Sequence, residues 1–182
     1  MPIEFTARFS KLTQQQQNQL AGWRRCVNGA EGADGPKSLW VYGERGAGSS
    51  YIGTCALHRI VLDHYDWDYE YFTAQKVMEA RRTMWDISRQ LPTEDPALMD
   101  EYLSIEEDFR FLWEKAQIIF IDNMHATLDL GFWRKHIYQP LEERVKAGKA
   151  TIIATSVSPN HPAFEDITRV IESTFVIVHA TR

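Results

Sequence analysis

The sequence predicts an α/β protein with a mostly parallel sheet and helices on both of its faces. Three short, largely apolar runs are interpreted as buried strands: Leu39–Tyr42, Gln117–Ile121 and Thr151–Ala154. Segments with helical periodicity separate these runs along the chain, and buried strands that alternate with helices are typical of parallel sheets covered on both sides. With 182 residues, of which 44% are hydrophobic, the chain is long enough for a single domain with a substantial core.

The first 36 residues are expected to form a helix and a loop that pack on a core formed by residues 37–182. Within residues 10–28, apolar side chains recur near helical spacing: Leu12, Leu20, Trp23 and Val27. A segment rich in Gly and Asp follows this helix, and it leads into the first predicted strand. Both parts therefore belong to one domain.

A Gly-rich turn follows the first predicted strand and leads into a helix that begins at Ser49. A strand, a Gly-rich turn and a helix N-terminus together form a cradle for phosphate, because backbone N–H groups and the helix dipole attract an anion. The pattern of such P-loops is G-x-x-x-x-G-K-[ST], and here Ser49 stands where the lysine is expected. The alternative is a Gly-rich turn that binds no ligand. The candidate nucleotide-binding residues in this stretch are Gly43, Glu44, Arg45, Gly46, Ala47, Gly48, Ser49, Ser50 and Tyr51.

The remaining elements follow from periodicity and from cap signals. Polar and aromatic residues alternate from Asp66 onward, which indicates a strand with Trp67, Tyr69 and Tyr71 on one face. Residues 91–108 are acidic and contain two prolines, so we expect a loop with short helical turns there. We expect a helix from Ser49 to near His64, a strand Asp66–Phe72 and a helix Ala74–Ser88 capped by Thr73. Further helices are expected near 109–115 and over 129–147. A helical turn near 164–171 and a strand over 174–178 complete the predicted elements.

Polar residues follow three of the predicted strands, and the carboxyl ends of parallel strands lie at one edge of a sheet. We therefore expect Gly43–Ser50, Asp122-Asn123 and Thr155-Ser156 to meet at one site. In a P-loop protein a carboxylate placed like Asp122 holds Mg²⁺ beside the hydroxyl of Ser50. Further expectations are a hydrogen bond from Ser156 to a γ-phosphate or a water, and cationic side chains for a nucleotide from Arg169 and Arg182.

The order and spacing of these motifs resemble the AAA+ helicase loaders DnaC and DnaI and their transposition relative IstB, in the short form often seen in phages. The resemblance rests on the helix with Trp23, on 41–56, on 71–74 before a helix with Arg81 and Arg82, on 119–123, on 141–153 and on 166–171 with 181–182. It implies a three-layer P-loop NTPase with a RecA-like AAA+ core that binds ATP or ADP with Mg²⁺. It also implies that Asp122 is the Walker B carboxylate, Ser156 the sensor, Arg169 the arginine finger of a homo-oligomer and Arg182 the final arginine.

The candidate catalytic residues Asp122, Asn123, Ser156 and Arg169 do not all match an active ATPase. Asn123 stands where the family commonly has an acid that activates water, and Ser156 replaces the usual sensor asparagine. Loss of the lysine at Ser49 removes a charge-assisted contact of roughly 1.5–3 kcal/mol. Loss of the water-activating acid removes a factor of about 10²–10⁴ in rate. Arg45 is a candidate substitute for the lysine, or else it faces solvent.

Two functions from different classes follow from these residues. The first is a DnaC-like protein of DNA replication in the bacterial cytoplasm that binds nucleotide, hydrolyses ATP slowly or not at all, and acts on a replicative helicase or another loader. The second is a pseudo-ATPase adaptor or an inhibitor of a host helicase loader.

DNA contact and export are the remaining questions that the sequence addresses. Arg81, Arg82 and Arg89 are candidates for tracking single-stranded DNA, or else they form a solvated helix face. With a net charge of −5, any such contact needs a local patch. We expect neither export nor membrane insertion, because the N-terminal residues lack the apolar stretch of a leader and no apolar run reaches membrane-spanning length. Cys26 and Cys55 are expected to be reduced thiols.

Overall fold

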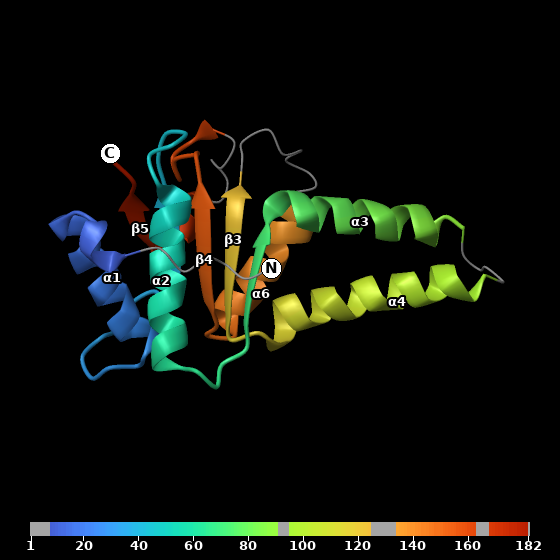
Figure 1. Ribbon diagram of the computed structural model, residues 1–182, viewed down its shortest axis with the longest axis horizontal. Coiled ribbons are helices and arrows are strands. Elements are labelled where there is room, and N and C mark those ends of the chain that lie inside the picture. Colours follow the sequence, from blue (N-terminus) through green and yellow to red (C-terminus); the bar gives the residue numbers. More distant parts are fainter. Residues whose placement is uncertain (1–7, 91–94, 125–133, 163–167, 182) are drawn as a thin grey trace.

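Five parallel strands form one sheet in the order β2-β3-β4-β1-β5 in the computed structural model, which describes residues 8–90, 95–124, 134–162 and 168–181. The strands are β1 (Ser38–Tyr42), β2 (Tyr69–Thr73), β3 (Ile118–Met124), β4 (Ala150–Thr155) and β5 (Phe175–His179). Because all five run in the same direction, their carboxyl ends lie along one edge, at the top of Figure 1. The prediction of a mostly parallel sheet is confirmed.

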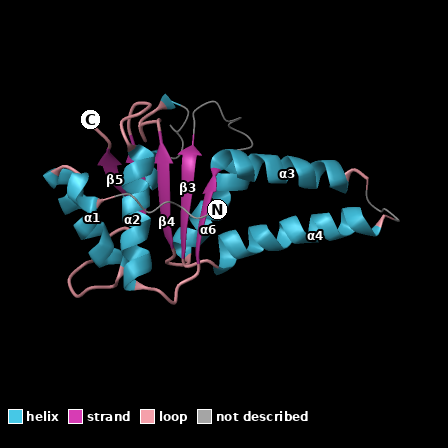
Figure 2. Cartoon of the chain, viewed as in Figure 1, coloured by secondary structure: helices cyan, strands magenta, loops and turns pink. Residues whose placement is uncertain are grey.

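Helices cover both faces of this sheet (Figure 2). One face packs against α1 (Gln14–Val27) and α2 (Ser49–Asp63). The opposite face packs against α3 (Ala74–Ser88), the C-terminal end of α4 (Pro96–Arg110), a π-helical turn η2 (Phe111–Lys115), a second such turn η3 (Arg134–Tyr138), α6 (Gln139–Lys146) and α7 (Thr168–Thr174). A short 3₁₀ turn, η1 (Phe9–Lys11), precedes α1.

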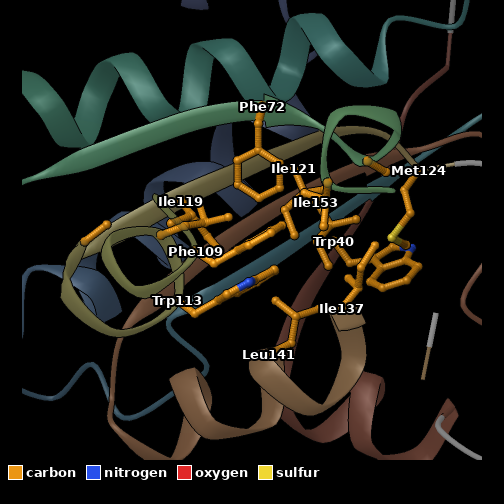
Figure 3. Packing of buried hydrophobic residues seen from close by; sticks show 14 of the residues in the cluster. Trp40, Phe72, Phe109, Trp113, Ile119, Ile121, Met124, Ile137, Leu141 and Ile153 are labelled. Carbon is orange, nitrogen blue, oxygen red and sulfur yellow. The ribbon is translucent and has the colours of Figure 1, made fainter. Parts of the chain in front are cut away.

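Two hydrophobic clusters, one on each face, follow from the alternation of side chains along the strands. On β3, Ile119 and Ile121 belong to the cluster beneath α3, α6 and η2, whereas Ile118 and Phe120 belong to the cluster beneath α1 and α2. Figure 3 shows the first of these clusters, in which side chains from the strands, α4, η2, η3 and α6 converge. The central strands β1, β3 and β4 are largely buried because both faces of the sheet are covered, whereas Tyr69 and Glu70 on the edge strand β2 are exposed.

The outer edge of β5 is covered by side-chain amides of α1. The Gln16 Nε2 donates to the carbonyl of His179 at 3.3 Å, and the Gln19 Nε2 donates to the carbonyl of Ile177 at 3.2 Å. These carbonyls lie two residues apart on the last strand of the sheet, so they point to the side that has no neighbouring strand. The polar glutamine run of α1 therefore has a structural role.

Helices α3 and α4 form a long hairpin, here called the arm, that projects beyond the sheet (Figure 1). The prediction of irregular structure at residues 95–108 is wrong. The Asp95 carboxylate accepts a hydrogen bond from the Ala97 N–H at 2.9 Å, and Pro96 occupies the first turn, where its missing N–H costs nothing. Tyr102, Ile105 and Phe109 then supply an apolar stripe that packs toward α3.

The predicted strand over Asp66–Phe72 begins later, at Tyr69. Trp67 lies in the preceding turn, where its ring stacks on His64 with 3.8 Å between the ring centroids. The contact with His64 thus packs the Trp67 ring in a turn, although the alternation of the sequence predicts a strand there. The predicted helix Ala74–Ser88 is confirmed, and the Thr73 hydroxyl accepts a hydrogen bond from the Lys76 N–H as its cap.

The C-terminal end of the predicted helix over 129–147 is confirmed by α6 and Gly148, whose φ is 69°, and its first residues lie outside the described chain. The helical turn expected near 164–171 is described only from Thr168 onward.

Cys26 and Cys55 are free thiols, and burial raises the pKa of Cys55 to about 11. In the described part of the chain, no helix is long and apolar enough to cross a membrane.

Candidate functional site

The Gly-rich loop lies at the carboxyl edge of the sheet, between β1 and α2. Gly48 precedes α2 with a φ of 97°, in the left-handed region that glycine adopts without strain. A Cβ at Gly43 would lie 2.5 Å from the carbonyl oxygen of Ala180, so a larger residue does not fit there. The Ala47 N–H donates to the carbonyl of Glu44 at 2.8 Å and tightens the turn. The loop therefore places the partner-free N–H groups of the first turn of α2 at this edge.

Asp122 lies opposite this helix start, near the end of β3, and its side chain connects three elements. The Ser50 hydroxyl donates to Asp122 Oδ1 at 2.7 Å, across 72 positions of sequence. The backbone N–H of Asn123 donates to the same oxygen at 2.8 Å. The Tyr71 hydroxyl, from β2, donates to Oδ2 at 3.1 Å. The expected meeting of Ser50 and Asp122 is thus present in the structure.

Tyr71 is a site residue that the sequence analysis did not identify as functional. Burial, the larger cause, and the neighbouring Asp122 carboxylate together raise its pKa to about 12. The phenol is therefore protonated at neutral pH and acts as a hydrogen-bond donor. The register between β2 and β3 explains why Tyr71 reaches Asp122. Tyr71 pairs with Phe120, and the side chain of Asp122 lies two residues later on the same face of β3 as that of Phe120.

The backbone bends immediately after Asp122. Asn123 is exposed and has a φ of 55°, and it is the single non-glycine residue with a positive φ in the part of the chain that the structure describes. The pairing of β3 with β4 shifts register between Ile121 and Met124. The shift leaves the side chain of Asn123 outside the regular ladder at the carboxyl edge.

At the end of β4, a buried threonine and an exposed serine stand side by side. The Thr155 hydroxyl donates to the carbonyl of Met124 and accepts from the Val157 N–H at 3.1 Å. The Gly43 N–H donates to the carbonyl of Thr155 at 3.3 Å. Thr155 therefore holds the ends of β1, β3 and β4 together, whereas Ser156 is exposed at the edge.

Other predicted site residues are exposed, have partners elsewhere or have side chains outside the described residues. Glu44 and Arg45 are exposed in the loop. The Tyr51 hydroxyl exchanges two hydrogen bonds with the backbone of Arg8, so its side chain is used to fix the segment before α1. Arg169 belongs to α7 but its side chain lies outside the described residues, as does Arg182.

The three arginines considered for DNA differ in exposure. The guanidinium of Arg81 lies over the ring of Phe109, with 3.9 Å to the centroid, and burial lowers its pKa. Arg82 is exposed and lines a pocket of about 390 Å³ on the arm, while the guanidinium of Arg89 lies 5.3 Å from the ring center of Trp85. Other lining residues are Trp85, Tyr102 and His136. Arg82 and Arg89 are therefore accessible, and Arg81 is largely used in packing.

The oxygen donors at the loop suit a hard cation. Ser50 and Asp122 offer a hydroxyl and a carboxylate 2.7 Å apart, which is the kind of donor set that Mg²⁺ takes together with waters and phosphate oxygens. Among the described residues, no group of three His, Cys, Asp or Glu side chains is arranged to hold a metal by itself. The donor set thus fits Mg²⁺ bound jointly with a phosphate ligand.

Comparison with solved structures identifies the fold. No protein-family model matches the sequence, and no curated protein matches it. Domain III of the replication initiation protein DnaA from Thermotoga maritima is similar over 98% of this chain and 67% of that one, with a TM-score of 0.68 and 14% identity. The DnaC helicase loader is similar over 96% of this chain and 97% of its own, with a TM-score of 0.61 and 14% identity.

A third structure, replication initiator DnaA bound to AMPPCP and single-stranded DNA, has a TM-score of 0.63 at 10% identity, and this chain spans about half of it, 49%. At these identities the likeness establishes the fold and not the activity. The predicted fold class, a mostly parallel sheet with helices on both faces, is confirmed, and the same fold occurs in domain III of DnaA and in the DnaC helicase loader.

Proposed function

We propose that this chain is a DnaC-like AAA+ protein that binds ATP or ADP and acts in DNA replication as a helicase loader. It would be the short form often seen in phages, and it would act in the bacterial cytoplasm. The observation that supports nucleotide binding is the 2.7 Å contact between Ser50 and Asp122 beneath the Gly-rich loop. This contact joins the helix N-terminus, which favours an anion, to the carboxylate that holds a cation in P-loop proteins.

Ser50 and Asp122 would hold Mg²⁺, whose charge neutralises the β- and γ-phosphates of a bound nucleotide. The N–H groups of the loop and of residues Ser49–Tyr51 would hold the phosphates. Ser49 has no ammonium to offer these phosphates, and Asn123 has no carboxylate to activate water. The proposal therefore includes weak or absent hydrolysis.

Calorimetric titration with Mg-ATP tests the proposal. We expect binding in the micromolar to millimolar range, roughly ten- to a hundredfold weaker than with a P-loop lysine, since that lysine contributes about 1.5–3 kcal/mol. Ser49→Lys should raise the affinity, and Ser104→Lys, which adds the same charge on an exposed position of α4, should not. Absence of binding at millimolar nucleotide would contradict the proposal.

The proposed partners are a replicative helicase or another loader, and single-stranded DNA along α3. The exposed Arg82 and Arg89, with the ring of Trp85 that is 60% exposed, combine cations with a stacking surface. Affinity for an oligonucleotide should fall as salt rises, and Arg82→Ala should reduce the steepness of that fall. Arg25→Ala on α1 is the matched control, because Arg25 is also exposed but lies on a different helix. Binding that ignores salt would argue against this role.

A second function, a pseudo-ATPase that serves as a protein-binding adaptor or inhibits a host loader, is favoured by the apolar side chains on the arm. Trp85, Met99 and Leu103 are 60%, 37% and 50% exposed, although all are large and hydrophobic. Exposed apolar side chains of this size on a projecting hairpin suit a protein contact. The calorimetric titration separates the two functions, because the adaptor needs no nucleotide.

A further inference from the structure

Both oxygens of the Asp122 carboxylate have defined partners. Oδ1 accepts from Ser50 and from the N–H of Asn123, and it is the oxygen that faces α2. Oδ2 accepts from the hydroxyl of Tyr71. Asp122 is 5% exposed, so water has little access to form further hydrogen bonds with either oxygen. The orientation of the carboxylate therefore depends on the two hydroxyl groups and on the backbone N–H of Asn123.

Tyr71 is well placed to fix that orientation, because packing fixes its own ring. The ring meets Phe120 edge to face, with 5.2 Å between the centroids and an angle of 64°. Phe120 is fully buried beneath α2, so close to the helix that a Cβ at Gly53 would lie 2.5 Å from its ring. Backbone pairing of Tyr71 with Phe120 sets the height of the ring on the sheet. The phenol thus reaches Asp122 from a rigid support.

We propose that Tyr71 is a positioning residue that holds Oδ2 of Asp122 and thereby keeps Oδ1 directed at Ser50 and at the cation that these two residues share. The inference rests on the proposed function and extends it to a residue of β2 that lies outside the P-loop and the Walker B position. Hydrogen-bond partners behind a metal ligand commonly set its orientation and affinity.

The hydrogen bond between Ser50 and Asp122 must open when a cation binds between these two residues. With Oδ2 held by Tyr71, the carboxylate keeps its direction while Oδ1 changes partner from hydroxyl to cation. Without the phenol, the backbone N–H of Asn123 remains as the partner of Oδ1 and Oδ2 loses its partner Tyr71, so the direction of the carboxylate is less strongly fixed. The metal-free affinity for nucleotide depends on the loop N–H groups and is independent of Tyr71.

Tyr71→Phe tests the inference, because it removes the hydroxyl and keeps the ring that packs on Phe120. The measurement is the affinity for a fluorescent ATP analogue, by anisotropy, with Mg²⁺ and with EDTA, in wild type and variant. We expect the gain in affinity from Mg²⁺ to fall by about tenfold, as for other residues behind a metal ligand, with unchanged affinity in EDTA. Tyr69→Phe is the matched control, since Tyr69 lies on the same strand and face but is 41% exposed.

The outcomes separate this inference from the proposed function. An equal gain from Mg²⁺ in wild type and Tyr71→Phe would overturn the role of Tyr71 and leave nucleotide binding intact. Equal weakening with and without Mg²⁺ would also overturn it, because that pattern indicates a merely structural role. Failure of the wild type to bind nucleotide in either condition would contradict the proposed function and this inference together.

Discussion

At the scale of single residues, Asn123 stands where an acid is expected in an active ATPase, and its backbone has a positive φ. Its φ of 55° lies in the left-handed region, which costs most L-residues about 1–2 kcal/mol. Asparagine tolerates this region better than other residues do, because its short amide can hydrogen-bond locally. The absence of a catalytic acid at this position is therefore compatible with a strand that bends immediately after Asp122.

We expect Asn123→Glu to lower the free energy of unfolding by about 1 kcal/mol, because glutamate takes the left-handed region less readily. Asn123→Gly should leave the stability unchanged or raise it. Urea denaturation at neutral pH measures both. Asn160→Glu provides the matched control at another exposed asparagine, whose φ is not positive. Equal stability of Asn123→Glu and wild type would show that the backbone there carries no strain.

Arg144 is a second residue whose role appears only in three dimensions. It is 1% exposed, and its guanidinium donates to six oxygen atoms, among them the carbonyls of Leu112, Ala116 and Ala150 at 2.9–3.0 Å. Burial lowers its pKa to about 10, so it remains a cation at neutral pH. Arg144 thus ties α6 to the end of η2 and to the start of β4.

Arg144→Met should lower the free energy of unfolding by about 3 kcal/mol or more, because it leaves several buried carbonyls without a donor. Thermal or urea unfolding measures the loss. The same substitution at Arg110, which is exposed at the end of α4, should cost much less. Similar losses at the two positions would show that the carbonyl cluster contributes little.

At the scale of elements, α1 and α2 are joined at the surface by a polar network around Asp63. Arg24 donates two hydrogen bonds to the Asp63 carboxylate, and Asn28 adds a third at 2.9 Å. These donors, with Arg24 first, hold the pKa of Asp63 at about 2, below its usual 3.8. The network couples the N-terminal helix to the helix that begins after the Gly-rich loop.

This network predicts a loss of stability in acid. A carboxylate whose pKa is lowered by folding contributes stability that is fully present above about pH 4 and is lost as the pH falls through 2. The difference in free energy of unfolding between wild type and Asp63→Asn should therefore be constant above pH 5 and shrink between pH 4 and 2. Denaturant titrations at several pH values measure it. A difference that does not change with pH would show that the ionised form is not stabilised.

Elements also show where sequence patterns fail. Pro96 in an acidic segment predicts irregular structure, yet at the first turn of a helix a proline is favourable, and Asp95 before it is a good cap. Alternation assigned Trp67 to a strand, but stacking on His64 places it in a turn. In both cases the local pattern has two solutions, and packing against a neighbouring element selects one.

At the scale of the whole molecule, the arm and the candidate site lie on different parts of the fold. Figure 1 shows α3 and α4 reaching away from the sheet, whereas the Gly-rich loop is at its carboxyl edge. Arg169, proposed as a finger, lies in α7, which packs through Ile171 on the face opposite α1 and α2. We propose that Arg169 acts as a finger on the nucleotide of a neighbouring copy.

Assembly with nucleotide is therefore expected. Sedimentation with Mg-ATP should show species larger than the monomer at high protein concentration, and Arg169→Ala should reduce them, because the proposed finger would contact the nucleotide across the interface. Arg25→Ala is the control at an exposed arginine of α1. A strict monomer with and without nucleotide would argue against a finger in trans.

The sequence alone predicted a mostly parallel sheet, the helix that begins at Ser49 and the proximity of Ser50 to Asp122. Apolar periodicity and the Gly-rich turn are local signals, and the carboxyl ends of parallel strands necessarily share an edge. Only the tertiary structure decided that Tyr71 holds Asp122, that Arg144 binds six oxygens and that Arg81 packs on Phe109. These contacts join residues far apart in the sequence, and they depend on strand register and helix packing, which no local pattern specifies.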